Sequence, residues 1–444
     1  MTDHKSSDIS RRKFLITTGA AVGGTAVMSG AAPFVRAASA PLQVPVGMVE
    51  PFSGSAAEFG PFYEEAAKLA IKHVNKAAEK VLGGPIITEL KVSDSNTLPT
   101  PGIDAAKRLI EVDGVPAIIC GWSSGVTVAV ATSATLPAGV LQVGNGTTSP
   151  LVTVLPEDRD RDLLFRTTAS DALQGVVAAQ MATGEIVEDL KYKTASTVYI
   201  NNPYGQGLSN AFSQAFQEMG GQVHAQVPHP EEVQSTYKSQ LAIALKDDPD
   251  LLMVPSYPSH TSVILKESRD VFDFTTWQLT DGNKSEDVLS AVGADTLNRT
   301  YGTAPGVDDQ SPAFKAFDEN FEKDDRPPFT ESAYDAAAVI GLALAKAIVK
   351  GDITDADEVT GSVIRDQLRE IANPPGEETF GGDQSGITEA MERIASGEDM
   401  NYTGPSGPTD FDEHGDVVTP YDIWKVEDGE FKSVRLWPAD KIKM

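Results

Sequence analysis

A serine between two glycines is the first candidate for chemistry in this chain. Residues 121–125 read Gly-Trp-Ser-Ser-Gly, which fits the pattern G-x-S-x-G, and an apolar run ends directly before them. In an α/β-hydrolase this pattern is a sharp strand-to-helix turn that exposes a catalytic serine, which here would be Ser123. Such an enzyme also needs a late histidine, and His414 lies near the C-terminus within an acidic Asp-Glu-His-Gly-Asp turn. Only two strand patterns and no HGGG-type oxyanion segment precede the serine, so a secreted serine hydrolase is a remote alternative.

The same turn can bind an anion without any reaction. If a strand ends at Cys120 and a helix begins near Ser124, the first N–H groups of the helix have no intrahelical partners. The helix dipole adds partial positive charge at that end, which favours a carboxylate. The hydroxyl of Ser123 or Ser124 then either caps the helix or reaches the ligand. The sequence leaves these two roles open.

Other residues that often carry chemistry are scattered. No histidine pair has the i, i+4 spacing of a helical metal site, and the single cysteine, Cys120, excludes an intramolecular disulfide and a C-x-x-C site. No G-x-G-x-x-G follows a strand pattern, and no G-x-x-x-x-G-K-[ST] occurs. We therefore expect no catalytic residue, no metal and no cofactor, and Cys120 is predicted to be a buried thiol.

The charge balance excludes two classes of partner. The 444 residues include 64 acidic and 36 basic ones, and the formal net charge is −28 at pH 7. Such a chain repels nucleic acid and anionic lipid surfaces. Its length is sufficient for two domains with full cores. Because the acidic residues are spread along the chain, they favour a solvated surface adapted to high salt, with ordinary solubility as the alternative.

The acidic surface leads to a prediction about salt. We expect the melting temperature of the exported protein to rise with sodium or potassium chloride well beyond ~0.15 M, where the Debye length is already about 8 Å. The physical reason is that added salt screens the repulsion among the acidic side chains. Thermal melts from low to molar salt test this, and a flat profile would mean that the acid excess serves solubility alone.

The N-terminus predicts export. Residues 10–15 read Ser-Arg-Arg-Lys-Phe-Leu, a twin-arginine pattern, and a moderately apolar stretch follows to residue 34. Small residues then suit cleavage within residues 37–40. We predict a twin-arginine signal peptide over residues 1–40 and a periplasmic location. Glycines and threonines within the apolar stretch disfavour a membrane anchor.

Apolar β-branched runs alternate with helical patterns through most of the chain. This alternation predicts a doubly wound α/β arrangement that occurs twice. The predicted strands are 42–49, 86–92, 117–120, 140–143, 196–200, 222–227, 251–254 and 276–279. The predicted helices among them are 61–81, 103–112, 125–136, 171 to about 190, 208–219, 236–246 and 261–271.

The last third of the chain has a different pattern. Helices are predicted at 313–321, 331–349 and 359–371, and residues 373–407 are rich in glycine, proline and acidic residues. Strands at 421–426 and 431–436 are joined by Asp428-Gly429, which is a strong hairpin signal. Two α/β halves with added helices and a hairpin indicate two lobes with more than one crossover.

Short motifs in a fixed order carry a family resemblance. They are residues 51–60, 122–126, 145–150, 165–175, 202–207, 281–282, 302–306 and 404–415. With these motifs the chain resembles periplasmic solute-binding proteins of the branched-chain amino-acid (Leu/Ile/Val-binding) type, the receptor components of ABC importers. Each motif is loose by itself, but their order extends over nearly the whole exported chain.

The resemblance implies a fold and a role. It implies a type I periplasmic binding protein fold, in which a multi-strand hinge joins two doubly wound lobes. Lobe I would comprise residues 41–169 and 306–408, and lobe II would comprise residues 170–305 and 409–444. It also implies a non-enzymatic monomer that captures a small polar ligand, most simply an amino acid, and delivers it to an ABC permease. Small amides, urea and aromatic acids are alternative ligands of the same fold.

The resemblance further implies a set of ligand-binding residues. In the family, a serine turn and the next loop bind the ligand carboxylate, an acid in the second lobe binds the ammonium group, and aromatic side chains close over the ligand. Carried over to this sequence, the carboxylate contacts are Ser123 or Ser124, Gly146 and Thr148, the ammonium contact is Asp281, and the aromatic residues are Phe59, Trp122, Tyr204 and Tyr257. Phe59 departs from a common tyrosine and removes one hydroxyl group. Tyr334 lies near another pocket position, but its surroundings favour helix packing.

Overall fold

A five-stranded parallel sheet forms the centre of lobe I. The structure is a computed structural model that describes residues 42–323 and 326–442, so the predicted signal peptide lies outside the described residues. The strand order is β2-β1-β3-β4-β5, and all four pairings are parallel. The strands are β1 (Val44–Glu50), β2 (Ile87–Asp94), β3 (Ala117–Cys120), β4 (Leu141–Gly144) and β5 (Leu164–Arg166).

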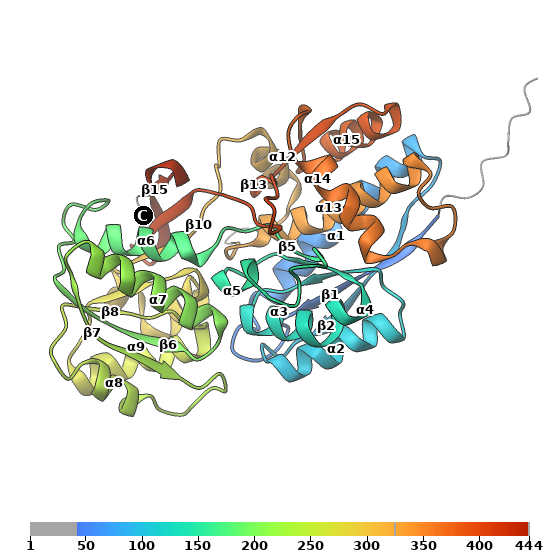
Figure 1. The fold of residues 1–444 in the computed structure, drawn as a ribbon. Helices are drawn as coiled ribbons and strands as arrows, with labels where there is room; N and C mark the ends of the chain where they lie inside the picture. Colours follow the sequence, from blue (N-terminus) through green and yellow to red (C-terminus); the bar gives the residue numbers. More distant parts are fainter. Residues whose placement is uncertain (1–41, 324–325, 443–444) are drawn as a thin grey trace, which may run out of the picture. The chain divides into compact units, whose positions relative to one another are not determined.

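Helices cover both faces of this sheet (Figure 1). On one face, α1 (Gly60–Val81) packs against α13 (Thr330–Lys350), and α14 (Gly361–Ala372) and α15 (Gln384–Ser396) pack beside them. On the other face are α2 (Pro99–Glu111) and α3 (Ser124–Val130), and α3 continues through a π-helical turn, Ala131–Thr135, into α4 (Leu136–Ala138). The short helix α5 (Pro150–Thr153) follows β4.

A seven-stranded sheet forms the centre of lobe II. Its order is β15-β14-β10-β9-β8-β6-β7; β14 pairs antiparallel with β10 and with β15, and the other pairings are parallel. The strands are β6 (Thr194–Ile200), β7 (Gln222–His229), β8 (Leu251–Met253), β9 (Trp277–Leu279), β10 (Tyr301–Pro305), β14 (Tyr421–Glu427) and β15 (Glu430–Trp437). The helices are α6 (Asp171–Thr183), α7 (Pro203–Glu218), α8 (Lys238–Ala244), α9 (Pro258–Phe272), α10 (Glu286–Val292) and α11 (Ala294–Leu297).

The hairpin and the doubly wound pattern are confirmed. Asp428 and Gly429 have φ values of 56° and 84°, the positive values that a tight two-residue turn between β14 and β15 requires. Helix α6 ends earlier than predicted, at Thr183, because Gly184 adopts a left-handed conformation and caps it.

Residues 373–407 contain elements that the sequence analysis did not assign. A three-stranded sheet comprises β11 (Glu377–Phe380), β12 (Met400–Gly404) and β13 (Gly407–Pro408), with α15 between β11 and β12 and α12 (Pro312–Asn320) nearby. Helix α15 buries Ile387, Ala390, Met391 and Ile394. Their spacing is that of a helix face, which the acidic composition of the segment concealed.

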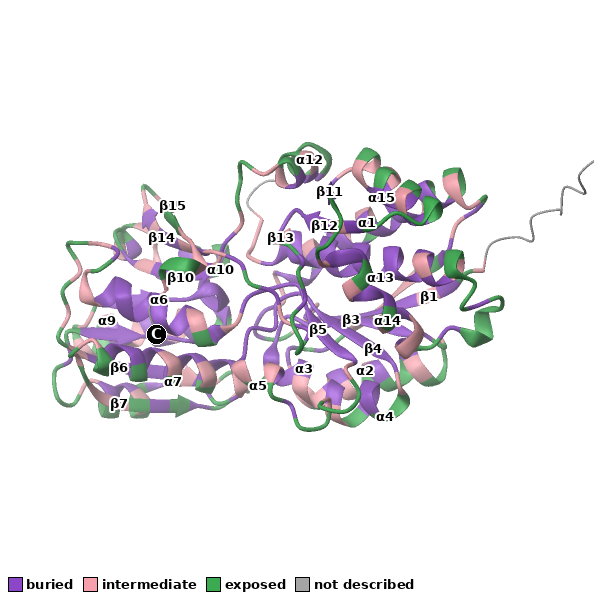
Figure 2. Cartoon of the chain, turned by 45° about the horizontal axis from the view of Figure 1, so that its top comes forward, coloured by how far each residue is buried: buried purple, intermediate pink, exposed green. Residues whose placement is uncertain are grey.

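Three segments of the described chain pass between the two lobes. They are residues 166–171, 305–312 and 408–421. Figure 2 shows the ribbon in the colour of buried residues where the first of them leaves β5, and residues 165–169 are all buried. This multi-strand connection agrees with the predicted architecture, while the bounds of the two lobes stay a prediction.

Helix α13 is the most apolar long helix among the described residues. By length and composition it is the one described helix that could cross a membrane, but nearly all of it is buried within lobe I against α1. We therefore assign it to the core. Tyr334 on this helix donates or accepts a hydrogen bond at 2.8 Å from His73 of α1, so the predicted packing role of Tyr334 is confirmed.

Candidate ligand-binding site between the two lobes

The carboxyl ends of the strands of both sheets carry the predicted site residues. In lobe I these are the segments after β1, β3 and β4, and in lobe II the segments after β6, β8 and β9. Hydrogen bonds join the two sets directly: the Ser149 hydroxyl donates to the Pro203 carbonyl at 2.8 Å, and the Ser259 amide donates to the Ser55 carbonyl at 3.2 Å. In open α/β sheets, ligands bind outside the carboxyl ends of the strands. The contact region of the two lobes is therefore the candidate site.

The serine turn has the local structure predicted for it. Ser123 is the N-cap of α3, and its Oγ accepts a long hydrogen bond, 3.5 Å, from the Val126 amide. The same Oγ lies 3.0 Å from the hydroxyl of Tyr257 in lobe II. The Ser124 hydroxyl accepts from the Ser149 amide at 3.2 Å and so fixes the loop after β4. Both serines are buried, and each already holds a neighbouring segment in place.

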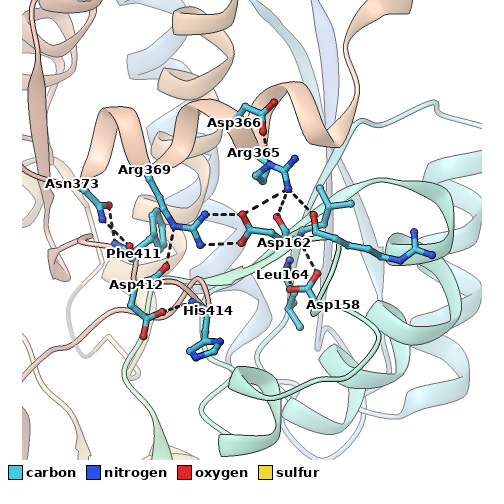
Figure 3. A network of polar contacts seen from close by, with 12 residues as sticks. Asp158, Asp162, Leu164, Arg365, Asp366, Arg369, Asn373, Phe411, Asp412 and His414 are labelled. Atoms are coloured by element: carbon cyan, nitrogen blue, oxygen red, sulfur yellow. Dashed lines mark hydrogen bonds and ion pairs between the residues drawn. The ribbon is translucent and has the colours of Figure 1, made fainter.

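The histidine that a hydrolase would need lies elsewhere. His414 belongs to a turn whose amides bond to the Asp412 carboxylate, and this turn is fixed to α14 because Arg369 donates to the Asp412 carbonyl at 2.9 Å. Arg369 also forms a bidentate pair with Asp162. Figure 3 shows the imidazole of His414 pointing away from this network, and its side chain is 48% exposed. Residues 412–414 are exposed, as the interpretation of a solvated turn requires, whereas Gly415 is buried and Asp416 pairs with Arg166. Ser123 has a tyrosine, not this histidine, as its hydroxyl partner.

Aromatic rings form a continuous row from lobe I to lobe II. The Phe59 and Trp122 ring centroids are 5.0 Å apart, and those of Trp122 and Tyr257 are 4.5 Å apart. Tyr257 stacks on Tyr204 at 5.6 Å. Gly146 lies against this row, because a Cβ atom there would approach Trp122 Cδ1 to 2.8 Å. Only glycine therefore fits at residue 146 without moving the indole.

Two carboxyl groups lie near each other on the lobe II side. Asp281 Oδ1 accepts hydrogen bonds from the Gln174 amide at 2.6 Å and from the Tyr204 hydroxyl at 3.2 Å. Asp171 Oδ2 accepts from the Thr148 hydroxyl at 2.9 Å. Burial raises the pKa of both carboxyls, and the charge of Asp281 raises the pKa of Asp171 further. Such a pair is stabilised by a cation placed between or beside the two groups.

Several buried polar atoms around this pair have no hydrogen-bond partner among the described residues. They are both side-chain amide atoms of Asn145, the hydroxyls of Thr147 and Thr168, Asp171 Oδ1 and Gln174 Oε1. Buried polar atoms in folded proteins are almost always bonded to protein, water or ligand. Their concentration next to the serine turn and the carboxyl pair indicates a polar site that receives a ligand or ordered water.

Some of these polar residues were not predicted from the sequence. Asn145 and Thr147 flank the predicted Gly146, and Asp171 and Gln174 lie in the motif 165–175 that carried part of the resemblance. Their position directly beside predicted binding residues was the one feature of the sequence that could have identified them as part of the site. Hydrogen bonds, ring contacts and the electrostatic interaction of the two carboxyls connect all nine predicted residues in one region. Their roles toward a ligand stay a prediction.

A cavity opens at the Phe59 end of the aromatic row. Its volume is about 560 Å³, and its lining includes Phe59, Phe62, Lys284 and Arg326. Glu58 also lines it and joins the lobes, since its carboxylate accepts hydrogen bonds from the Ser285 hydroxyl and from the Asp287 amide. Within residues 42–323 and 326–442, no three His, Cys, Asp or Glu side chains are placed to hold a metal ion.

Comparison with protein families gives one extensive match. Residues 43–430 match the model of a family described as periplasmic binding protein. A relative from Halobacterium salinarum, a chemotactic signal transduction system substrate-binding protein, is 26% identical over 412 residues, covering 88% of this chain and 89% of the relative. A Leu/Ile/Val-binding protein from Rhizobium johnstonii is 26% identical over 345 residues, covering 76% of this chain and 87% of the relative.

Solved structures confirm the predicted fold. A leucine-binding protein from Thermotoga maritima superposes with a TM-score of 0.71 at 23% identity, covering 89% of this chain and 99% of that one. A branched-chain amino acid transporter substrate-binding protein from Streptococcus pneumoniae, solved with isoleucine, has a TM-score of 0.67 at 19% identity. The superposition covers 89% of this chain and 99% of the Streptococcus pneumoniae chain. At these identities the structures establish the fold alone.

Proposed function

This chain belongs to the periplasmic binding protein family, in its branched-chain amino-acid type, and on that premise we propose that it captures an amino acid between its lobes and delivers it to an ABC permease. It is a solute-binding protein and not an enzyme, and its family works outside the cytoplasm. Export by the twin-arginine route, the monomeric state and adaptation to high salt are part of the proposal. The names of the relatives support an amino acid as the ligand class.

The carboxyl pair of Asp171 and Asp281 is the observation that carries the amino-acid assignment. Both groups are buried beside a serine turn, and a buried carboxylate without a cation is costly. The ammonium group of an amino acid supplies that cation. Small amides, urea and aromatic acids are not favoured, because they would leave both carboxyls without a positive partner.

The opposite end of the ligand meets hydrogen-bond donors. We assign three sets of donors to the ligand carboxylate. They are the amides around Gly146, the amides in the first turn of α3, and the hydroxyls of Ser123 and Ser124. Thr148 is predicted to contact the ligand carboxylate, and in this structure its hydroxyl donates its proton to Asp171. We assign its hydroxyl oxygen to the ligand ammonium group as an acceptor, and its backbone to the side of the site that binds the ligand carboxylate.

Closure of the lobes is the signal that the permease would read. The ligand contacts come from both lobes, so the full set forms only when the lobes meet. A ligand then favours the closed state by its differential affinity for it. The Ser123–Tyr257 and Glu58–Ser285 contacts, which join the lobes directly, would stabilise the same state.

The two serines of the turn give a prediction. We expect Ser123→Ala and Ser124→Ala to weaken amino-acid binding by about 1–3 kcal/mol for whichever hydroxyl contacts the ligand, because a charge-assisted hydrogen bond is lost. Titration calorimetry measures the effect, and Ser133→Ala on the outer turn of the same helical segment is the control. A covalent adduct of Ser123 with a fluorophosphonate probe would contradict the binding role and restore the hydrolase alternative.

A ligand screen tests the function as a whole. Thermal-shift measurements of the exported chain against amino acids, small amides, urea and aromatic acids should give stabilisation by amino acids, since a ligand that binds only the folded state raises its stability. Stabilisation by aromatic acids or urea alone would overturn the amino-acid assignment. The name of the Halobacterium salinarum relative raises a second role, chemotactic sensing, which shares the same ligand-binding step.

A further inference from the structure

A third buried carboxyl group, that of Glu50, lies on the lobe I side of the site. Glu50 is the last residue of β1 and is fully buried. Its Oε2 accepts a hydrogen bond from the Trp122 amide at 3.1 Å, and its Oε1 has no hydrogen-bond partner among the described residues. Burial raises its pKa well above the ordinary value, and the Trp122 amide is the one group that lowers it. Within the part of the chain that the structure describes, its carboxylate bonds to the Trp122 amide and no cationic side chain pairs with it.

The position of Glu50 in the sheet places it at the same edge as the serine turn. Strand β1 lies between β2 and β3, so its carboxyl end shares an edge with the serine turn that follows β3. Trp122, whose amide holds Glu50, contacts both Phe59 and Tyr257 in the aromatic row.

The charges on the two sides of the site do not balance for a neutral amino acid. Its ammonium group matches the Asp171–Asp281 pair, and its carboxylate matches the serine turn. Glu50 then remains buried without a positive partner. Arg166, the one fully buried arginine within residues 42–323 and 326–442, lies on β5 and is bonded to Asp416 and to backbone carbonyls. A buried carboxylate is stable when a cation joins it.

We infer that Glu50 binds a second positive group on the ligand, so that the site selects basic amino acids with an ammonium or guanidinium side chain over branched-chain ones. This inference rests on the proposed amino-acid function. Trp122, whose amide bonds to Glu50, and its ring neighbour Phe59 suit such a group, because cations bind favourably over aromatic faces. The free Oε1 of Glu50 supplies the acceptor, and the Trp122 amide holds the other oxygen in place.

The experiment compares basic amino acids with neutral ones of the same length. Calorimetry on the exported chain uses L-arginine against L-citrulline and L-lysine against L-norleucine, with L-leucine as the branched-chain probe. We expect each basic ligand to bind at least about 30-fold more tightly than its neutral counterpart, because a side-chain cation stabilises the ionised Glu50 carboxylate and a neutral side chain does not. Glu50→Gln should remove most of that ratio.

A matched control separates this role from the general effect of a buried carboxyl. Asp335 is also fully buried in lobe I, but both oxygens of its carboxylate already accept hydrogen bonds, from Ser406 and Tyr402. Asp335→Asn should leave the ratio of arginine to citrulline affinity unchanged. If Glu50→Gln fails to fold, the ratio of arginine to citrulline affinity in the native protein still tests whether the site selects basic amino acids.

Proton release is a second readout. A cation beside Glu50 favours its ionised form, so arginine should release more protons on binding than citrulline, as measured in buffers of different ionisation enthalpy. Glu50→Gln should abolish the difference. Equal or tighter binding of citrulline, norleucine or leucine would overturn the role of Glu50 and leave the proposed function intact. Absence of binding by every amino acid tested would overturn both.

Discussion

Asp281→Ala is expected to weaken amino-acid binding by about 2–5 kcal/mol, which is the largest effect that we expect from any single side chain of the site. Asp281 is buried and is held by Gln174 and Tyr204, so its carboxylate is positioned before a ligand arrives. Its removal leaves the ligand ammonium buried with one carboxyl partner fewer. Calorimetry of the variant measures the loss, and Asp295→Ala, which removes an exposed acid of the same lobe, is the control.

The same carboxyl pair predicts how binding depends on pH. Burial raises the pKa of Asp171 and of Asp281 in the free protein, and a bound ammonium group favours the ionised form. Binding therefore releases protons, and affinity should fall as the pH is lowered through the raised pKa values, well above the ordinary aspartate value of about 3.9. Affinity that stays constant from pH 7 to pH 4.5 in the native protein, together with an unaffected Asp281→Ala variant, would exclude an ammonium group at this pair.

Arg166→Met is expected to lower the free energy of unfolding by about 3–5 kcal/mol, because it leaves a largely buried carboxylate and two carbonyl groups without their partner. Arg166 is fully buried at the end of β5 and donates to Asp416 Oδ2 at 2.6 Å and to the Ser149 carbonyl at 3.0 Å. It thus joins the first and third connecting segments to the loop after β4. Urea unfolding at constant pH measures the change.

An exposed ion pair provides the comparison for Arg166. Arg393 pairs with Glu389 and Glu398 on the surface, where both acids are more than half exposed. Arg393→Met should cost about 1 kcal/mol or less, because exposed pairs contribute little. Equal losses for the two variants would show that Arg166 has no special part in holding the connecting segments.

The sequence by itself determined the elements that depend on local pattern. Alternating apolar runs and helical periods predicted the two doubly wound lobes, and Asp428-Gly429 predicted the closing hairpin. The serine turn was predictable for the same reason, since a helix N-terminus needs a capping oxygen and Ser123 supplies it. The resemblance then gave positions for a ligand site before any geometry was known.

Only the tertiary structure decided which polar groups meet. Asp171 and Asp281 are separated by more than one hundred residues, and Glu50 reaches Trp122 only because β1 and β3 are neighbours in the sheet. No local pattern marks such residues as buried or paired. The strands of the β11–β12–β13 sheet were not predicted for a related reason. They are short, and they are strands because they pair with neighbouring strands, not because their own side chains form a clear pattern. Local chemistry determines what a segment can form, whereas burial and the charges around it, which set the role of a carboxyl group, are properties of the folded chain.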